Sequence, residues 1–216
     1  PLIVLNFKTY SESSGSNALR LAKHIEKVSS KRYEIVVAPS LLTMKEIAEK
    51  TSLNVYSQHA DNTGLGAHTG SIPVEELKLI KVKGTLLNHS ERKMPFEALS
   101  ETVKLCRKYS LKTIICASSL SELAKIAKLQ PDHLAYEPPE LIGGNISVTN
   151  AHPEVLLKAS KLLKKISPKT MLLCGAGVHS KEDLHKALEL GAKGVLIAHA
   201  VVKAKNPERF LKKMLS

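Results

Sequence analysis

The sequence predicts an α/β fold in which one domain, residues 1–216, forms a closed (β/α)8 barrel. The first observation is that short apolar runs alternate with amphipathic helical patterns along the whole chain, in about eight strand–helix units. The second is that the runs are continuously apolar, as expected when both faces of a parallel sheet are covered. The third is the length, which fits one large domain at the short end of the range for such barrels. A doubly wound open sheet is the alternative, but it usually has fewer units, and no Gly-x-Gly-x-x-Gly pattern follows the first run.

The expected strands are the apolar runs at residues 2–7, 33–38, 53–58, 84–87, 113–117, 133–136, 171–174 and 195–198. The first helix is marked by a stripe with a period of 3.6 residues, formed by Ala18, Leu21, Ala22, Ile25 and Val28. Further helices are expected at 41–50, 74–80, 121–129, 153–166 and 181–190, and another around Phe96, Leu99, Val103 and Cys106. A last helix is expected near Pro207, because proline suits the first helical turn.

The composition narrows the class of protein. The chain carries a net charge of +12, which invites a nucleic-acid hypothesis, but the aromatic content is 4% and there is no Trp to stack on bases. The lysines lie mainly on polar helix faces, and a positive field can also gather an anionic metabolite. The first apolar run is too short for a signal peptide or a membrane span. Three cysteines without a Cys-x-x-Cys pair favour a reducing cytoplasm.

The stretch at residues 135–145 places a carboxylate, Glu137, where an apolar run stops. Pro138 and Pro139 follow, so a helix cannot begin there, and Gly143 and Gly144 come a few residues later. A loop that is stiff at one end and permissive at the other can move as a unit. An acid beneath a mobile lid is one interpretation, and a buried or capping Glu beside an ordinary turn is the other.

Other polar residues stand where the expected strands end, which is where barrels of this kind place their chemistry. Asn6 and Lys8 follow the first strand, His89 follows the fourth, and Glu137 follows the sixth. Proton transfer beside a carbonyl needs a base, an electrophile and a positive charge for the enediolate, and these side chains supply all three. The small-residue turns at 175–177 and 198–199 leave backbone N–H groups free to hold a phosphate.

These residues resemble the triosephosphate isomerase family, in the shorter version found in archaea. The resemblance is carried by segments spread over nearly the whole chain, namely Asn6-Phe7-Lys8, Asn88-His89-Ser90-Glu91-Arg92, Ala135-Tyr136-Glu137-Pro138-Pro139, Leu141-Ile142-Gly143-Gly144 and Cys174-Gly175-Ala176-Gly177. It implies reversible conversion of dihydroxyacetone phosphate and glyceraldehyde 3-phosphate, a step of glycolysis and gluconeogenesis, without a cofactor or a metal.

The resemblance also assigns roles. It implies that Glu137 is the base, that His89 is a neutral electrophile, and that Lys8 and Asn6 contact the substrate. Glu91 matches an acid behind these groups, and a helix starting near Ser90 would keep His89 uncharged. The implied lid is Pro138, Pro139, Glu140, Leu141, Ile142, Gly143 and Gly144. The implied phosphate contacts, chiefly through the backbone, are Ile142, Gly143, Gly177, Ala198 and His199.

The loop at residues 59–72 is too long to be a plain connector and resembles the family's interface loop, with Thr69 at the tip that reaches a neighbouring subunit. A homodimer or homotetramer is therefore implied. One departure from the family is His199, where relatives carry a small residue; we expect its ring to point away or to assist the phosphate when protonated. The segment at residues 149–153 is a milder departure, with little expected consequence.

The remaining polar and sulfur residues have plainer interpretations. The other histidines lack metal-ligand spacing, and we expect them to be structural or exposed; they are His24, His59, His68, His133, His152, His179 and His185. Cys116 and Cys174 are expected to be small buried hydrophobes. Two competing functions remain open: another phosphosugar-binding barrel enzyme, and a basic barrel recruited to bind nucleic acid.

Overall fold

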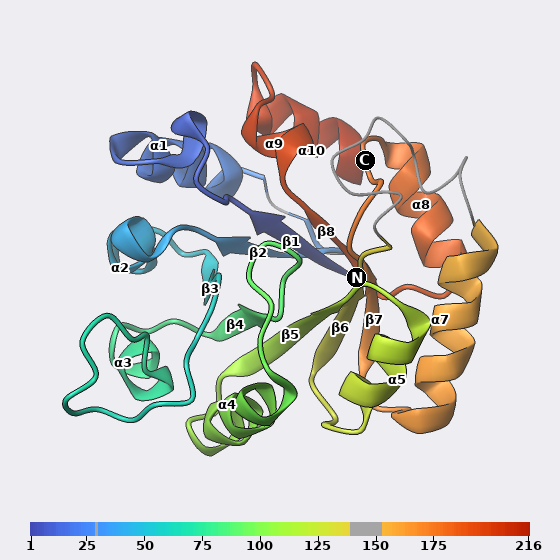
Figure 1. Ribbon diagram of the computed structural model, residues 1–216. Helices are drawn as coiled ribbons and strands as arrows, with labels where there is room; N and C mark the ends of the chain where they lie inside the picture. Colours follow the sequence, from blue (N-terminus) through green and yellow to red (C-terminus); the bar gives the residue numbers. More distant parts are fainter. Residues whose placement is uncertain (29, 139–152) are drawn as a thin grey trace.

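The computed structural model describes residues 1–28, 30–138 and 153–216, and within them parallel strands close into a barrel in the order β1 to β8 (Figure 1). The strands are β1 (Leu2–Asn6), β2 (Glu34–Ala38), β3 (Asn54–Ser57), β4 (Gly84–Leu87), β5 (Lys112–Ala117), β6 (His133–Tyr136), β7 (Met171–Cys174) and β8 (Gly194–Ile197). The barrel closes where β1 pairs with β8, with Leu2 opposite Gly194 and Leu5 opposite Ile197. The predicted (β/α)8 barrel is therefore confirmed, and each strand lies within a residue or two of its predicted position.

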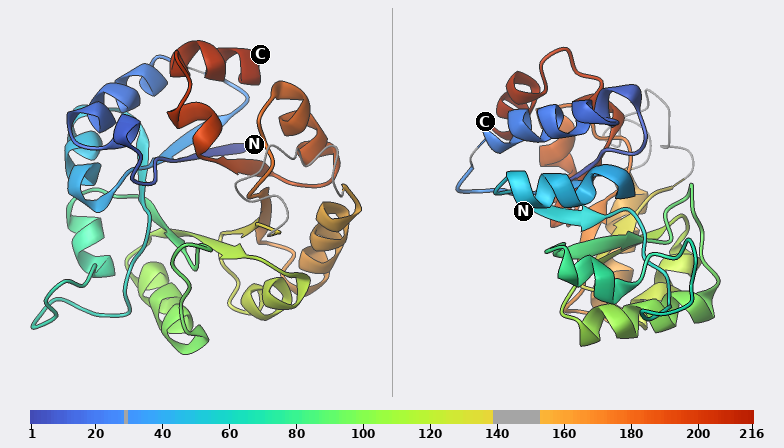
Figure 2. Two further views of the ribbon diagram at one scale, coloured as in Figure 1. Left: turned by 45° about the horizontal axis from the view of Figure 1, so that its top comes forward. Right: turned by 90° about the vertical axis from the view of Figure 1, so that its left-hand side faces the viewer.

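Helices surround the barrel on its outer side (Figure 2). They are α1 (Ser16–Glu26), α2 (Leu41–Lys50), α3 (Val74–Leu79), α4 (Phe96–Lys108), α5 (Leu120–Ala127), α7 (Pro153–Ile166), α8 (Lys181–Glu189), α9 (His199–Val202) and α10 (Pro207–Leu215), with a 3-10 turn, η1, at Ser11–Ser13. The stripe predicted for the first helix is buried as expected. Of the described helices, none combines the length and the apolar character needed to cross a bilayer.

Both faces of the strands are buried, which explains why the apolar runs in the sequence are continuous rather than alternating. Alternate residues of each strand belong to two separate clusters. Leu2 and Val4 of β1 pack inside the barrel with Val36, Leu86, Ile114, Leu173 and Leu196 from other strands. Ile3 and Leu5 face outward and pack against the helices. The barrel interior is thus a filled apolar core, and the polar side chains of the cavity lie where the strands end.

Two features differ from the sequence expectations. The chain does not start a helix near Ser90, because α4 begins only at Phe96 and residues 88–95 form a loop. The short elements η1 and α9 were not expected.

The loop at residues 59–72 leaves the barrel beside α3, and its residues 64–70 are all exposed (Figures 1 and 2).

Candidate active site

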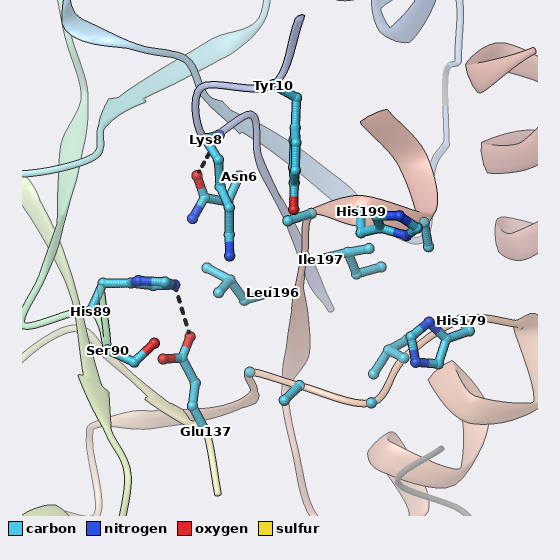
Figure 3. A pocket seen from close by; sticks show the side chains of 16 residues that line it. Asn6, Lys8, Tyr10, His89, Ser90, Glu137, His179, Leu196, Ile197 and His199 are labelled. Atoms are coloured by element: carbon cyan, nitrogen blue, oxygen red, sulfur yellow. Dashed lines mark hydrogen bonds and ion pairs between the residues drawn. The ribbon is translucent and has the colours of Figure 1, made fainter. Parts of the chain in front are cut away.

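One cavity of about 390 Å3 opens at the carboxyl ends of the strands and collects most of the predicted site residues (Figure 3). Asn6 and Lys8 follow β1, His89 follows β4, Glu137 follows β6, and the turns after β7 and β8 complete the wall. Lys8, His89 and Glu137 lie on one side of the cavity, and His179 and His199 on the other. Its lining also includes Tyr10, Ser90, Gly175, Gly177, Leu196, Ile197 and Ala198.

Glu137 is a carboxylate held at the edge of an apolar core. Its backbone N–H donates to the carbonyl of Ala117 at 2.8 Å, and its side chain is only 3% exposed. Burial raises the pKa of Glu137 to about 7, although the Cys116 thiol and the Lys8 charge oppose that rise. The thiol of Cys116 donates to Oε1 of Glu137 at 3.5 Å. A carboxylate with a pKa near neutrality is a stronger base than an exposed one and is still substantially ionised at pH 7.

Gly175 supports Glu137 from the next strand. A Cβ atom at this position would overlap Cγ of Glu137, so no larger residue fits without displacing the carboxylate. The backbone N–H of Gly175 donates to the carbonyl of Tyr136 at 2.9 Å, which keeps the turn after β7 against the end of β6. Gly175, the first residue of the 175–177 turn, therefore leaves the space that the Glu137 side chain occupies.

His89 faces Glu137 across a short gap. The backbone N–H of Glu91 donates to Nδ1 of His89 at 3.1 Å, so Nδ1 is unprotonated and the neutral ring carries its proton on Nε2. Nε2 lies 3.7 Å from Oε1 of Glu137. Burial, followed by the charge of Lys8, lowers the pKa of His89 below its usual value. The neutral state expected from a helix start near Ser90 thus has a different origin here.

Lys8 is held from both its backbone and its side chain. It adopts a positive φ of 47°, which is uncommon outside glycine, and its N–H donates to Oδ1 of Asn6 at 3.0 Å. Its ammonium lies 2.7 Å from Oε1 of Glu91, the acid that the family resemblance places behind the site. Nε2 of Gln58 donates to the carbonyls of Lys8 and Ala38. The hydrogen bonds to Asn6 and from Gln58 maintain this uncommon conformation.

The far wall of the cavity is made of small residues and two imidazoles. Gly177 has a φ of 71°, and His199 opens the short helix α9 after Ala198. The ring of His199 lies edge-on to the ring of Tyr10, with centroids 6.3 Å apart, and the ammonium of Lys203 lies 5.1 Å from the Tyr10 centroid. The His199 ring therefore lines the cavity rather than pointing away. His179, expected to be structural or exposed, is exposed at the same rim.

A comparison with known sequences identifies the chain's relatives. A sequence model described as triosephosphate isomerase matches residues 1–214. The chain belongs to the triosephosphate isomerase family. A protein named triosephosphate isomerase from Methanocaldococcus jannaschii is 43% identical, over 99% of this chain and 98% of its own length. One of the same name from Methanothermus fervidus is 42% identical, over 100% of this chain and 98% of its own length. The resemblance to the archaeal members of the family is thereby confirmed.

The cavity thus brings together Asn6, Lys8, His89, Glu137 and the 198–199 turn of this triosephosphate isomerase family member. Pro138 is buried next to Glu137, but the rest of the expected lid, Pro139 to Gly144, lies outside the described residues, and so do the expected phosphate contacts Ile142 and Gly143. Within the described ranges, no group of three or more His, Cys, Asp or Glu side chains could hold a metal ion.

Sequence reasoning missed several residues around this site. Cys116 was expected to be a plain hydrophobe, yet its thiol contacts the Glu137 carboxylate. Gln58 fixes the Lys8 backbone, and its only signal was a polar residue at the end of the third apolar run. Glu122 bonds to the loop that carries His89, and nothing in its helical context indicated that contact.

Proposed function

We propose that this member of the family interconverts dihydroxyacetone phosphate and D-glyceraldehyde 3-phosphate in the cavity, with Glu137 as base and His89 as electrophile. The observation that carries the proposal is the placement of a buried carboxylate with a raised pKa opposite the Nε2 of a neutral imidazole, at 3.7 Å. This division of roles is well known for triosephosphate isomerases. The relatives' names and the family match supply the substrate class.

In the proposed reaction the Glu137 carboxylate removes a proton from the carbon beside the substrate carbonyl. The electron pair of the broken C–H bond forms the enediolate double bond, while the Nε2–H of His89 donates to the oxygen that gains charge. The Glu137 carboxyl then returns a proton to the neighbouring carbon, and the hydroxyl proton passes between the two oxygens through His89. The Lys8 ammonium stabilises the negative charge and Asn6 orients the oxygens. Because these groups provide base, electrophile and charge, the proposed reaction uses neither cofactor nor metal.

At the other end of the cavity the proposed phosphate contacts are backbone N–H groups of Gly177, Ala198 and His199, together with Ile142 and Gly143 of the lid at residues 138–144. The positive φ of Gly177 and the position of His199 as the first residue of α9 support this assignment. Lid closure over the phosphate would exclude water from the enediolate.

We further propose that residues 1–216 act as one domain in a cytoplasmic homodimer or homotetramer. The exposed residues 64–70, with Thr69 among them, support self-association through the projecting loop. Another phosphosugar substrate is one alternative, because the proposed backbone contacts to phosphate do not by themselves select one sugar. Nucleic-acid binding is the other alternative; against it stand the low aromatic content and lysines spread over helix faces.

The decisive experiment is a coupled assay of triose phosphate interconversion by the purified chain and its Glu137→Gln variant. Loss of the base should lower kcat by at least ~10²–10⁴-fold, since general-base catalysis alone is worth that much. Glu46→Gln on the exposed face of α2 is the matched control and should retain parental activity. An inactive but folded parent would refute the proposal. In that case longer sugar phosphates in the same assay, and retention on heparin at moderate salt, would separate the two alternatives.

A further inference from the structure

Glu122 is the third residue of α5, and part of its bonding is a helix cap. The hydroxyl of Ser119 accepts from the Glu122 N–H at 3.1 Å. The Glu122 carboxylate reaches back and accepts from the N–H and the hydroxyl of Ser118, at 2.7 and 2.8 Å. A Ser followed three residues later by Glu is the usual sequence of such a cap. The cap thus accounts for two of the donors to the Glu122 carboxylate, both of which belong to Ser118 in the loop before α5.

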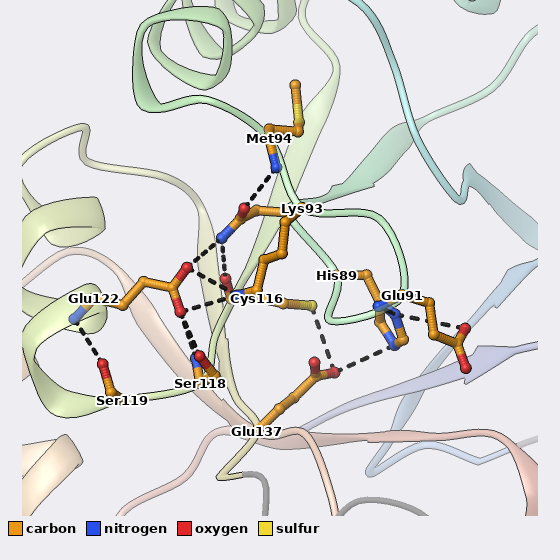
Figure 4. Close-up of polar contacts among 10 residues, drawn as sticks. His89, Glu91, Lys93, Met94, Cys116, Ser118, Ser119, Glu122 and Glu137 are labelled. Carbon is orange, nitrogen blue, oxygen red and sulfur yellow. Dashed lines mark hydrogen bonds and ion pairs between the residues drawn. The ribbon is translucent and has the colours of Figure 1, made fainter.

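The same carboxylate also holds the loop between β4 and α4, which a cap does not require. Nδ2 of Asn88 donates to its Oε1 at 2.8 Å, and the ammonium of Lys93 lies 2.8 and 2.9 Å from its two oxygens (Figure 4). An isolated, partly exposed ion pair contributes little to stability. Here, however, one carboxylate gathers donors from Ser118, Asn88 and Lys93, and so fastens two active-site loops to each other.

Asn88 connects this cluster to His89, which is the next residue. Asn88 has a φ of 57°, and besides Glu122 its Nδ2 reaches the carbonyl of Cys116 at 2.9 Å. Its Oδ1 accepts the backbone N–H of Met94 at 3.0 Å. The amide therefore ties together both ends of the segment 88–94, and the His89 ring projects from inside that segment. A shift of Asn88 would be transmitted directly to His89.

Lys93 connects the cluster to the catalytic pair by charge. Its ammonium contributes to lowering the pKa of His89, after burial and Lys8, and it also opposes the rise in the pKa of Glu137 caused by burial. Burial disfavours the ionised form of Glu122, but the bonds from Lys93, Ser118 and Asn88 outweigh it and lower its pKa to about 2. Glu122 is thus ionised throughout the neutral range and balances the Lys93 charge.

We propose that Glu122 is a positioning residue for catalysis: by holding Asn88 and Lys93, its carboxylate fixes His89 opposite Glu137 and sets the distance from which the Lys93 ammonium acts on both. The inference rests on the roles proposed for His89 and Glu137. The other groups that face this pair are the Lys8 ammonium from the loop after β1, Glu91 from the loop after β4, and the Cys116 thiol from β5. Glu122 acts through these loops and does not itself touch the substrate.

The test compares Glu122→Gln, Lys93→Met and the double variant with the parent, using kcat, KM and the pH dependence of kcat/KM. The chain offers a matched control in Asp132, which accepts bonds from the Lys112 ammonium at 2.7 Å and from the Thr113 N–H at 3.0 Å. This second carboxylate cluster precedes β6, at the end of the barrel away from the cavity. Asp132→Asn should lower the melting temperature and leave kcat and the pH profile unchanged.

If Glu122 positions the pair, Glu122→Gln lowers kcat by about 10–100-fold with KM within about threefold of the parent, because small misplacements of catalytic groups are costly. The unbalanced Lys93 charge then moves the acidic limb of kcat/KM to lower pH, and Lys93→Met moves it to higher pH. Glu122 and Lys93 should also show coupling in the double variant.

A kcat within about twofold of the parent, or an acidic limb unmoved in both single variants, would overturn the inference. An inactive parent would instead refute the proposed function, and Lys93→Met decides the question if Glu122→Gln does not fold.

Discussion

At the scale of single residues, the site depends on a carboxylate that is almost completely removed from solvent. Glu137 lies at the boundary between the barrel core and the cavity, with the Cys116 thiol on one side and His89 on the other. Its environment favours the protonated form in the folded chain, and the same burial makes the ionised form a stronger base. Catalysis and stability therefore make opposite demands on this one side chain.

This conflict predicts that Glu137→Gln stabilises the protein at alkaline pH while abolishing activity. The folded pKa of about 7 exceeds the ordinary value of 4.5, so the stability that the protonated acid contributes is present below pH 4.5 and is lost as the pH rises through 7. A pKa shift of this size corresponds to about 3 kcal/mol of unfolding free energy, which the parent loses at alkaline pH. The amide of the variant does not titrate, so the variant does not lose this stability. Without substrate, the variant should melt several degrees above the parent at pH 8 and close to it at pH 4.5.

Thermal unfolding of both proteins, followed across that pH range, measures the difference, and Glu46→Gln provides an exposed control with no pH-dependent gain. A Glu137→Gln variant less stable than the parent at pH 8 would show that the carboxylate is not under desolvation stress in the folded state.

At the scale of elements, the sequence was informative about strands and much less so about loops. Continuous apolar runs locate the strands, because strands covered on both faces are mainly apolar. The prediction that a helix begins near Ser90 was wrong. Residues 88–95 form a loop, which is held by side-chain hydrogen bonds of Asn88 rather than by helical backbone bonds. Likewise, the contacts of Cys116 and Gln58 depend on the register between strands that helices separate in the chain, which no local pattern encodes.

The turn after β7 allows a test of this loop-scale precision. Gly175→Ala should lower kcat by about 10²-fold, because its Cβ would displace the Glu137 carboxylate. Gly84→Ala at the start of β4 is the comparison, since its Cβ would meet the Tyr56 ring and the Lys112 carbonyl at the other end of the barrel. That variant should lose stability, yet keep parental kcat per folded molecule. Equal kcat losses in the two variants would contradict a specific role for Gly175.

At the scale of the whole molecule, the chain carries a net charge of +12, and the proposed substrate is an anion. Part of the positive field acts on the association of an anionic ligand with the protein rather than on the chemical step. Salt weakens this part, because it screens exposed charges. The other large-scale feature is the loop at residues 59–72, which leaves the barrel beside α3 and exposes residues 64–70. A bonded base anchors it: Asp61 accepts from His59 at 2.9 Å and from the Ile72 N–H at 2.7 Å.

A loop anchored at its base and exposed at its tip predicts that Thr69→Arg disrupts self-association. A long charged side chain at a buried contact is costly unless it finds a partner. Sedimentation velocity should show a smaller species for this variant, with reduced activity. Glu189→Arg, on the exposed face of α8, should leave the parental assembly intact. A chain that sediments as a monomer before any substitution would exclude the proposed oligomer.

The closure of the barrel by β1 and β8 has a consequence for synthesis on the ribosome. The two strands pair from Leu2 opposite Gly194 to Leu5 opposite Ile197, so they are separated by almost the entire chain. Asn6 and Lys8 can therefore face the 198–199 turn only after all the residues between them have been translated. A nascent fragment that ends before residue 198 lacks part of the cavity wall. Two halves of the chain divided between β4 and β5 would have to pair both along β1 and β8 and along β4 and β5 before the barrel closes.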